Sequence, residues 1–219
     1  MGGAPGSVGP RTHGPTGGGS NPLSAPVEDS RAVPLGQHSS KMHLFLDTET
    51  TGTGELDAVV EIGAVDAEGE ERMNTLVRPL APMSREARST HGIDEATLEK
   101  APRFREVARA LQHHVRRADT VWAYNAGFDR RLLIQTAEMA GASAAKKALR
   151  QAEWRDLMDR ATDHLGEDAW VSLAEAAERL GAGPEEGVLH RAKGDAALAW
   201  RVWKRLGAPA FSEGRERTR

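Results

Sequence analysis

The chain has 219 residues, enough for one α/β domain with a buried core and too few for two full enzyme domains. Its 29 Lys and Arg residues against 32 Asp and Glu residues give a net charge of -3, which excludes a protein that binds polyanions through bulk positive charge. There is no cysteine, so disulfides, thiolate zinc sites and cysteine nucleophiles are excluded. Neither an apolar run of roughly 20 residues nor the apolar core of a secretion signal is present, so we expect a cytoplasmic protein without membrane contact.

Composition divides the chain into one folded segment and two tails. Residues 1–41 hold 9 of the 23 glycines and 6 of the 11 prolines, and such a segment cannot bury enough apolar surface to offset its ordering entropy. We therefore predict a disordered Gly/Pro-rich tail over 1–41, a folded domain over 42–208 and a polar C-terminal tail over 209–219.

From residue 42 onward, strand and helix patterns alternate along the chain. The predicted strands are His43–Asp47, Ala58–Val65, Arg72–Arg78 and Thr120–Tyr124. A turn at Ala67–Gly69 joins the second and third of these strands into a hairpin. The predicted helices are Phe104–Arg117, Arg130–Ala140, Val171–Leu180 and Asp195–Leu206. A hairpin followed by alternating strands and helices predicts an α/β fold, with a mixed β-sheet flanked by α-helices.

Acidic side chains stand near three ends of these predicted elements. Asp47 and Glu49 are two positions apart on a strand, so both carboxylates project from one face, and like charges this close become favourable once a hard divalent cation lies between them. Asp129 and Asp195 each stand where a helix begins, and the ordinary interpretation of either residue alone is an N-cap. His190 precedes Asp195 by five residues, although most histidines in a domain of this size are structural.

Together, these groups resemble the DEDDh group of the DnaQ-like 3′→5′ exonucleases, which have a ribonuclease H-like fold. The resemblance spans Leu44 to about Leu206. The motifs that carry it are FLDTETTG at Phe45–Gly52, EIGAV at Glu61–Val65, HGI at His91–Ile93, NAGFD at Asn125–Asp129 and HRAKGDA at His190–Ala196. Tyr124 stands where many members carry His, a position outside the metal ligands that bears on the subfamily rather than on activity.

The resemblance implies a nuclease that uses two Mg²⁺ or Mn²⁺ ions. Asp47, Glu49 and Asp195 would surround one ion. Asp47 would also bridge to the second ion, on which Asp129 would act largely through water. His190 would be the general base, and the reaction would release nucleoside 5′-monophosphates from a 3′ end.

The resemblance also implies a set of substrate contacts around the terminal nucleotide. The residues in this set are Thr50, His91, Ile93, Asn125, Phe128 and Arg191. For His91 the alternative is a loop histidine that caps a turn. Phe128 alone is more typical of core packing than of base stacking.

Basic residues near the acids indicate how an acidic protein would hold nucleic acid. The cations that could steer a phosphate backbone are Arg130, Arg131, Arg191 and Lys193. Lys146, Lys147 and Arg150 form another basic cluster, whose simpler interpretation is a solvated helix face.

The leading hypothesis is a metal-dependent exonuclease that degrades single-stranded or frayed 3′ ends of DNA in proofreading or repair, with a DNA polymerase as a candidate partner. One alternative is the same chemistry on RNA or short oligoribonucleotides, since the motifs do not report whether the pocket accepts a 2′-OH. The other is a catalytically silent binding module, against which the complete set of four acids and one histidine argues.

Overall fold

The computed structural model describes residues 42–183 and 191–207, so both predicted tails and His190 lie outside the described residues. The strands of the described part are β1 (His43–Thr50), β2 (Val59–Asp66), β3 (Glu71–Leu76), β4 (Thr120–Ala123) and β5 (Trp154–Asp156). Its helices are α1 (Arg85–His91), α2 (Glu95–Glu99), α3 (Phe104–Arg117), α4 (Ala126–Met139), α5 (Ser143–Gln151), α6 (Leu157–Leu165), α7 (Leu173–Arg179) and α8 (Ala192–Arg205). None of these helices combines the length and the apolar character that crossing a membrane would require.

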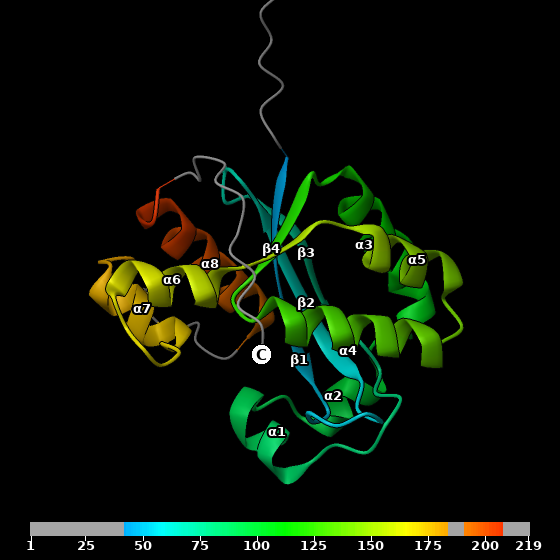
Figure 1. Cartoon of the computed structure of the whole chain (residues 1–219). Coiled ribbons are helices and arrows are strands. Elements are labelled where there is room, and N and C mark those ends of the chain that lie inside the picture. The colour runs from blue at the N-terminus through cyan, green and yellow to red at the C-terminus, as the bar shows by residue number, and fades with distance from the viewer. Residues whose placement is uncertain (1–41, 184–190, 208–219) are drawn as a thin grey trace, which may run out of the picture. The chain divides into compact units, whose positions relative to one another are not determined.

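The five strands form one mixed sheet with β1 at its centre (Figure 1). In the order β3-β2-β1-β4-β5, β1 pairs antiparallel with β2 and parallel with β4. β3 extends the antiparallel half and β5 extends the parallel half. The β2–β3 turn contains Gly69, whose φ of 86° lies in the left-handed region that glycine adopts most easily. The arrangement confirms the predicted hairpin and the predicted mixed sheet.

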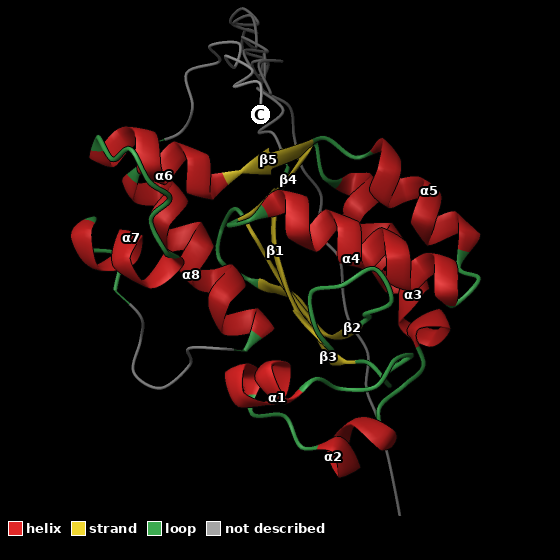
Figure 2. Ribbon diagram, turned by 60° about the horizontal axis from the view of Figure 1, so that its bottom comes forward, coloured by secondary structure: helices red, strands yellow, loops and turns green. Residues whose placement is uncertain are grey.

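Helices cover both faces of this sheet (Figure 2). α3, α4 and α5 pack on one face, and α6, α7 and α8 pack on the other. Successive side chains of a strand point to opposite faces, so β1 contributes to both cores. Leu44 and Leu46 lie in the core with α3–α5, whereas Phe45 lies in the core with α6–α8. The same alternation decides where the polar residues further along β1 point.

α1 and α2 form a short helical pair that packs on β2 through a third, small core. Val60, Ile93 and Leu98 make up the buried part of that core. The sequence analysis does not predict either helix, because seven and five residues are too few for a helical period to be recognisable. Their beginnings are fixed by caps, since the side chains of Ser84 and Asp94 each accept a hydrogen bond from a backbone N–H of the first turn.

The helices α4 and α8 begin earlier than predicted. α4 begins four residues before the predicted Arg130, and α8 begins three residues before the predicted Asp195. Each first turn contains a glycine, which weakens the helical pattern in the sequence. The N-cap positions belong to Asn125 and Arg191. Asp129 and Asp195 therefore stand one turn inside their helices, and the interpretation of either residue as an N-cap is wrong.

Candidate active site

The end of β1 presents polar side chains to two different helical layers. Asp47 and Glu49 share the face of Phe45, on the α8 side, and Thr48 shares the face of Leu46, on the α4 side. The strand runs three residues past its predicted end, because its antiparallel pairing with β2 continues there. The parallel pairing with β4 stops at Phe45. One edge of the last part of β1 therefore lacks this strand neighbour, and α4 contacts β1.

α8 brings Asp195 to the two carboxylates of β1. One carboxylate oxygen from each of Asp47, Glu49 and Asp195 lies within 4.8 Å of the others, and we call these three residues the carboxylate cluster. Carboxylate oxygens are the ligands that hard cations such as Mg²⁺ and Mn²⁺ prefer. The cluster thus fits a divalent cation by both its chemistry and its spacing.

Asp129 approaches the same centre from the first turns of α4. Its side chain is only 3% exposed, and its Oδ1 atom accepts a hydrogen bond of 2.8 Å from Thr48 Oγ1. It is not one of the three acids within direct ligand spacing, but its charge helps to raise the pKa of Asp47. Asp129 therefore adds negative charge beside the carboxylate cluster.

The acids of the site raise one another's pKa values. Removal from water, followed by the charges of Asp129 and Asp195, raises the pKa of Asp47 well above its ordinary value. Burial, with the charges of Asp195 and Glu61, raises the pKa of Glu49 to about 7. Burial also raises the pKa of Asp129 to about 7, despite a side-chain hydrogen bond that lowers it. Ionising all of these groups is costly, and a bound divalent cation would remove that cost.

A buried ion pair fixes the start of α8. Glu61 of β2 is 1% exposed, and the Nε atom of Arg191 lies 3.1 and 3.0 Å from its two carboxylate oxygens. Arg191 Nη2 lies 2.6 Å from Glu61 Oε1, and the backbone N–H of Ala192 donates to Glu61 Oε2 at 3.1 Å. The guanidinium of Arg191 is thus held by Glu61, although 49% of its side chain is exposed. This role of Glu61 was not predicted: a lone charge inside the apolar run of β2 marks the residue as unusual, but it does not identify Arg191 as its partner.

The start of α8 also lies directly against the backbone of β2. A Cβ atom on Gly63 would lie 2.1 Å from Lys193 N and 2.2 Å from the carbonyl carbon of Ala192. Since Cβ contacts this short do not occur, only glycine permits the approach. This contact and the Glu61 ion pair together place α8 where Asp195 reaches β1.

Thr50, His91 and Ile93, three of the predicted substrate contacts, are buried near the end of β1. Thr50 donates a hydrogen bond of 2.7 Å to the backbone carbonyl two residues further along. His91 Nδ1 accepts a hydrogen bond from the N–H of Ile93 at 3.0 Å. This bond is the one expected if His91 caps a turn, which was the alternative to a substrate contact. The Nε2 atom of His91 is also buried, beside the backbone of Thr50, and burial lowers the pKa of this imidazole. Ile93 lies in the small core with α2.

Asn125 and Phe128, two more of the predicted contacts, stand at the start of α4, and Arg191, the last of the set, is the residue held by Glu61. Asn125 is exposed, and Phe128 is half-buried against the core with α3–α5. Asp156 of β5, which the sequence analysis did not identify, fixes this region. Its Oδ2 atom accepts the N–H of Ala126 at 2.9 Å, and its Oδ1 atom accepts the N–H of Met158 at 2.9 Å. One carboxylate therefore holds the starts of both α4 and α6.

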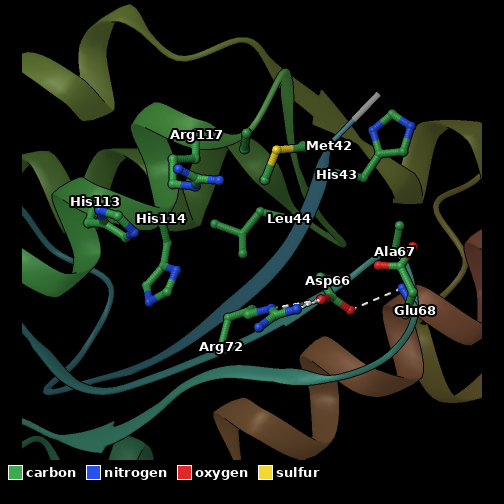
Figure 3. Close-up of a pocket in the computed structure, with 11 residues that line it drawn as sticks. Met42, His43, Leu44, Asp66, Ala67, Glu68, Arg72, His113, His114 and Arg117 are labelled. Carbon is green, nitrogen blue, oxygen red and sulfur yellow. Dashed lines mark hydrogen bonds and ion pairs between the residues drawn. The ribbon is translucent and has the colours of Figure 1, made fainter. Parts of the chain in front are cut away.

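A separate cavity of about 320 Å³ lies beside the start of β1 (Figure 3). Leu44, Arg72, His114 and Arg117 are among the residues that line it. Asp66, a half-buried acid in its lining, binds within the β2–β3 turn: Oδ1 accepts two backbone N–H groups, and Oδ2 accepts the guanidinium of Arg72. Asp66 and Arg72 therefore stabilise the hairpin, and the candidate active site is the carboxylate cluster.

Comparison with known proteins agrees with this assignment. The family model described as exonuclease (RNase T) matches residues 44–203. The chain belongs to this exonuclease family. The exonuclease is 32% identical over 166 residues to the uncharacterized exonuclease CP81 of Escherichia phage 186, a match that covers 71% of the chain and 82% of the phage protein. It is also 33% identical over 96 residues to the DNA polymerase III subunit epsilon of Escherichia coli strain K12, which covers 39% of each protein.

Solved structures show the same fold. The structure titled exonuclease X in complex with 5′ overhanging duplex DNA matches with a TM-score of 0.57 and 28% identity, over 77% of this chain and 95% of that chain. Exonuclease I of E. coli in complex with a dA16 oligonucleotide matches with a TM-score of 0.59 and 18% identity, over 75% of this chain and 41% of that chain. These matches bear out the expected ribonuclease H-like sheet flanked by helices.

Proposed function

We propose that this exonuclease hydrolyses DNA from the 3′ end in a metal-dependent reaction and releases nucleoside 5′-monophosphates. The observation that carries the proposal is the carboxylate cluster, three acids with ligand atoms within 4.8 Å, with Asp129 beside it. The relatives support DNA as the substrate, because one is a DNA polymerase subunit and exonuclease X was crystallised on duplex DNA. The 5′ overhang of that duplex leaves a recessed 3′ end.

Two Mg²⁺ or Mn²⁺ ions are part of the proposal. Asp47, Glu49 and Asp195 would hold one ion, and Asp47 and Asp129 would hold the second, the latter through water. When bound, such ions activate the attacking water and stabilise the charge on the leaving oxygen. The chain itself holds the four acids in position, and because the pKa values of Asp47, Glu49 and Asp129 are raised, ion binding should displace protons near neutral pH.

His190 is the proposed general base. It directly precedes Arg191, which the ion pair with Glu61 anchors, and an imidazole with an ordinary pKa of about 6.5 accepts a proton readily near neutrality. His190→Ala should lower kcat by about 10²–10⁴-fold while leaving Mn²⁺ affinity largely unchanged. A pH–rate profile that stays flat through the imidazole range, with chemistry rate-limiting, would remove His190 from this role.

The test of the proposed function compares 5′-labelled oligonucleotides with Mg²⁺, Mn²⁺ or EDTA. The substrates are single-stranded DNA, duplex DNA with a matched or mismatched recessed 3′ end, and RNA of the same sequence. We expect a metal-dependent ladder of shortened DNA products that Asp47→Ala abolishes. Asp168→Ala, which removes an exposed carboxylate outside the site, should behave as wild type. Degradation by Asp47→Ala at the wild-type rate would contradict the nuclease, and faster cleavage of RNA would favour the ribonuclease alternative.

We also propose a proofreading role beside a DNA polymerase, supported by the similarity to epsilon subunits. A proofreading enzyme should remove a mismatched 3′ nucleotide faster than a matched one, because the frayed end enters the site more easily. Equal rates on the two duplexes would argue against this role.

A further inference from the structure

A basic groove adjoins the first turns of α4. It is an open cavity of about 730 Å³ lined by α4, α5 and the loop at residues 51–58. Its cations are Arg130 and Arg131 of α4 and Arg150 of α5, and we call it the arginine groove. The lining residues of α4 recur every three or four positions from Gly127 to Glu138, so they form one face of the helix.

The arginine groove keeps most of its positive charge. Among the ion pairs of residues 42–183 and 191–207, none involves its three arginines. Two carboxylates line the groove, Glu55 and Glu138. Glu138 is paired with Lys146 at 2.6 Å. The groove therefore has three guanidinium groups and one carboxylate, Glu55, that is in none of the ion pairs of the described residues. This local excess of positive charge lies on a chain whose net charge is -3.

The three arginines differ in what they contact. Arg131 Nη2 donates to the backbone carbonyl of Thr53 at 3.0 Å, and the Arg131 guanidinium lies 5.5 Å from the centre of the Phe128 ring. These contacts attach the loop to α4 and make Arg131 a structural residue. Arg130 is exposed, and its Nη2 atom makes only a long contact of 3.4 Å with the backbone carbonyl of Arg150. Arg130 and Arg150 can therefore turn toward a ligand without loss of an internal ion pair.

The position of the groove connects it to the active site. Asp129 and Arg130 are neighbours on α4, yet Asp129 is buried against Thr48 while Arg130 is exposed in the groove. One side of this helical turn therefore faces the catalytic acids, and the other side faces the groove. From Gly127 to Glu138, the helix rises about 16 Å, which is long enough for only a few nucleotides of one strand.

We propose that the arginine groove binds the sugar-phosphate backbone of the strand whose 3′ end lies at the carboxylate cluster, upstream of the terminal nucleotide. This inference rests on the proposed function. Guanidinium groups bind phosphate through paired hydrogen bonds, and contacts to the backbone carry no sequence information. The groove therefore lets an acidic protein hold any sequence through a few local charges.

The structure also revises the interpretation of the basic residues. In the sequence, Arg130 and Arg131 belong to one group, and Lys146, Lys147 and Arg150 belong to another with the appearance of a solvated helix face. In the fold, Arg150 joins Arg130 and Arg131 in one groove, whereas Lys146 is paired with Glu138. Arg150 is exposed, as a solvated helix face predicts, and it lines the same groove as the two arginines of α4.

The experiment measures binding and cleavage by the full chain carrying Arg130→Gln and Arg150→Gln together. Binding of a labelled single-stranded DNA 20-mer is followed by fluorescence anisotropy in EDTA, so that no cleavage occurs, over a series of salt concentrations. Cleavage is compared on the 20-mer and on a dinucleotide without a 5′ phosphate, whose only phosphodiester is the one that is cleaved, so that no upstream phosphate is left for the groove to bind. The control variant carries Arg116→Gln and Arg117→Gln together, a matched loss of two exposed cations at the end of α3, of which Arg117 is seen in Figure 3.

We expect the double variant to bind the 20-mer about 10- to 100-fold more weakly than wild type, with a salt slope smaller by about 1.4, or about 0.7 for each lost phosphate contact. KM for the 20-mer should rise, while kcat/KM for the dinucleotide should match wild type. Binding of the 20-mer equal to that of the control variant would overturn the proposal, and so would equal losses on both substrates. If wild type cleaves neither substrate, the proposed function fails, and the binding measurement still decides whether the groove holds DNA.

Discussion

The ion pair between Glu61 and Arg191 offers the sharpest test of how the active site is assembled. Glu61→Gln preserves the volume of the side chain but replaces one acceptor oxygen with an NH₂ group. That group must face either the Arg191 guanidinium or the N–H of Ala192, both of which are donors. The substitution therefore breaks the contact on which the start of α8 depends.

The expected loss in the free energy of unfolding is about 2–3 kcal/mol. Removing one partner of a fully buried pair costs about 3–5 kcal/mol. The cost is smaller here because 49% of the Arg191 side chain is exposed and can return to water. For a domain of this size, the melting temperature should fall by about 5–10 °C. Since α8 carries Asp195, Mn²⁺ affinity should fall by about 10- to 100-fold, the usual effect of losing a residue that orients a ligand.

Calorimetric titration with Mn²⁺ and thermal unfolding in EDTA measure the two effects. Lys193→Gln is the matched control, because it breaks an exposed pair with Glu71 at the same helix start and should cost less than about 1 kcal/mol. Removal of the Glu61 charge also lowers the pKa of Glu49 and weakens the attraction of the site for a cation, so both effects of the substitution act toward weaker ion binding. Unchanged or tighter Mn²⁺ binding by Glu61→Gln would therefore refute the argument that this pair positions α8.

Three further predictions concern the remaining supports of the site. Gly63→Ala should lower the free energy of unfolding, measured with denaturant, by about 3 kcal/mol or more, since the new Cβ has no room. Gly127→Ala is the control: its Cβ would meet nothing within 4 Å, and it should raise the free energy of unfolding by up to about 1 kcal/mol. Thr48→Val should lower kcat about tenfold by freeing Asp129, and Thr48→Ser should restore it; equal rates for all three proteins would remove Thr48 from this role. Glu49 and Asp129 bind protons more tightly in the folded state than in the unfolded state. Their contribution to the free energy of unfolding in EDTA should therefore be complete below about pH 4 to 5 and should be lost as the pH rises through about 7. Melting curves that show no such fall, or a fall that saturating Mn²⁺ does not reverse, would contradict this last prediction.

The sequence predicted the elements whose patterns are long and regular. α3 has the predicted bounds, because four buried positions recur along its whole length at helical spacing. The hairpin followed from two apolar runs around Gly69. α5, β5 and α6 were not predicted. α5 has no side-chain cap at its start, and β5 is three residues long and is a strand only through its pairing with β4.

The acids of the site could be identified from the sequence, but the residues that hold these acids in position could not. Asp47 and Glu49 carry a local signal, since their spacing on one strand is visible without a fold. Glu61 acts on Arg191, a residue 130 positions away, and only the folded chain brings the two together. Arg150 likewise meets Arg130 only because α5 packs on α4. Long-range contacts of this kind have no periodic signature, so a single sequence does not reveal them.

Asp129 and Asp195 come from helices on opposite sides of the sheet (Figure 2). A chain with only one of these layers in place cannot gather all four acids around the end of β1. Half-folded copies, whether newly synthesised or partly unfolded by heat, should therefore be unable to cut nucleic acid. Activity would therefore be confined to molecules in which both helical layers have folded onto the sheet.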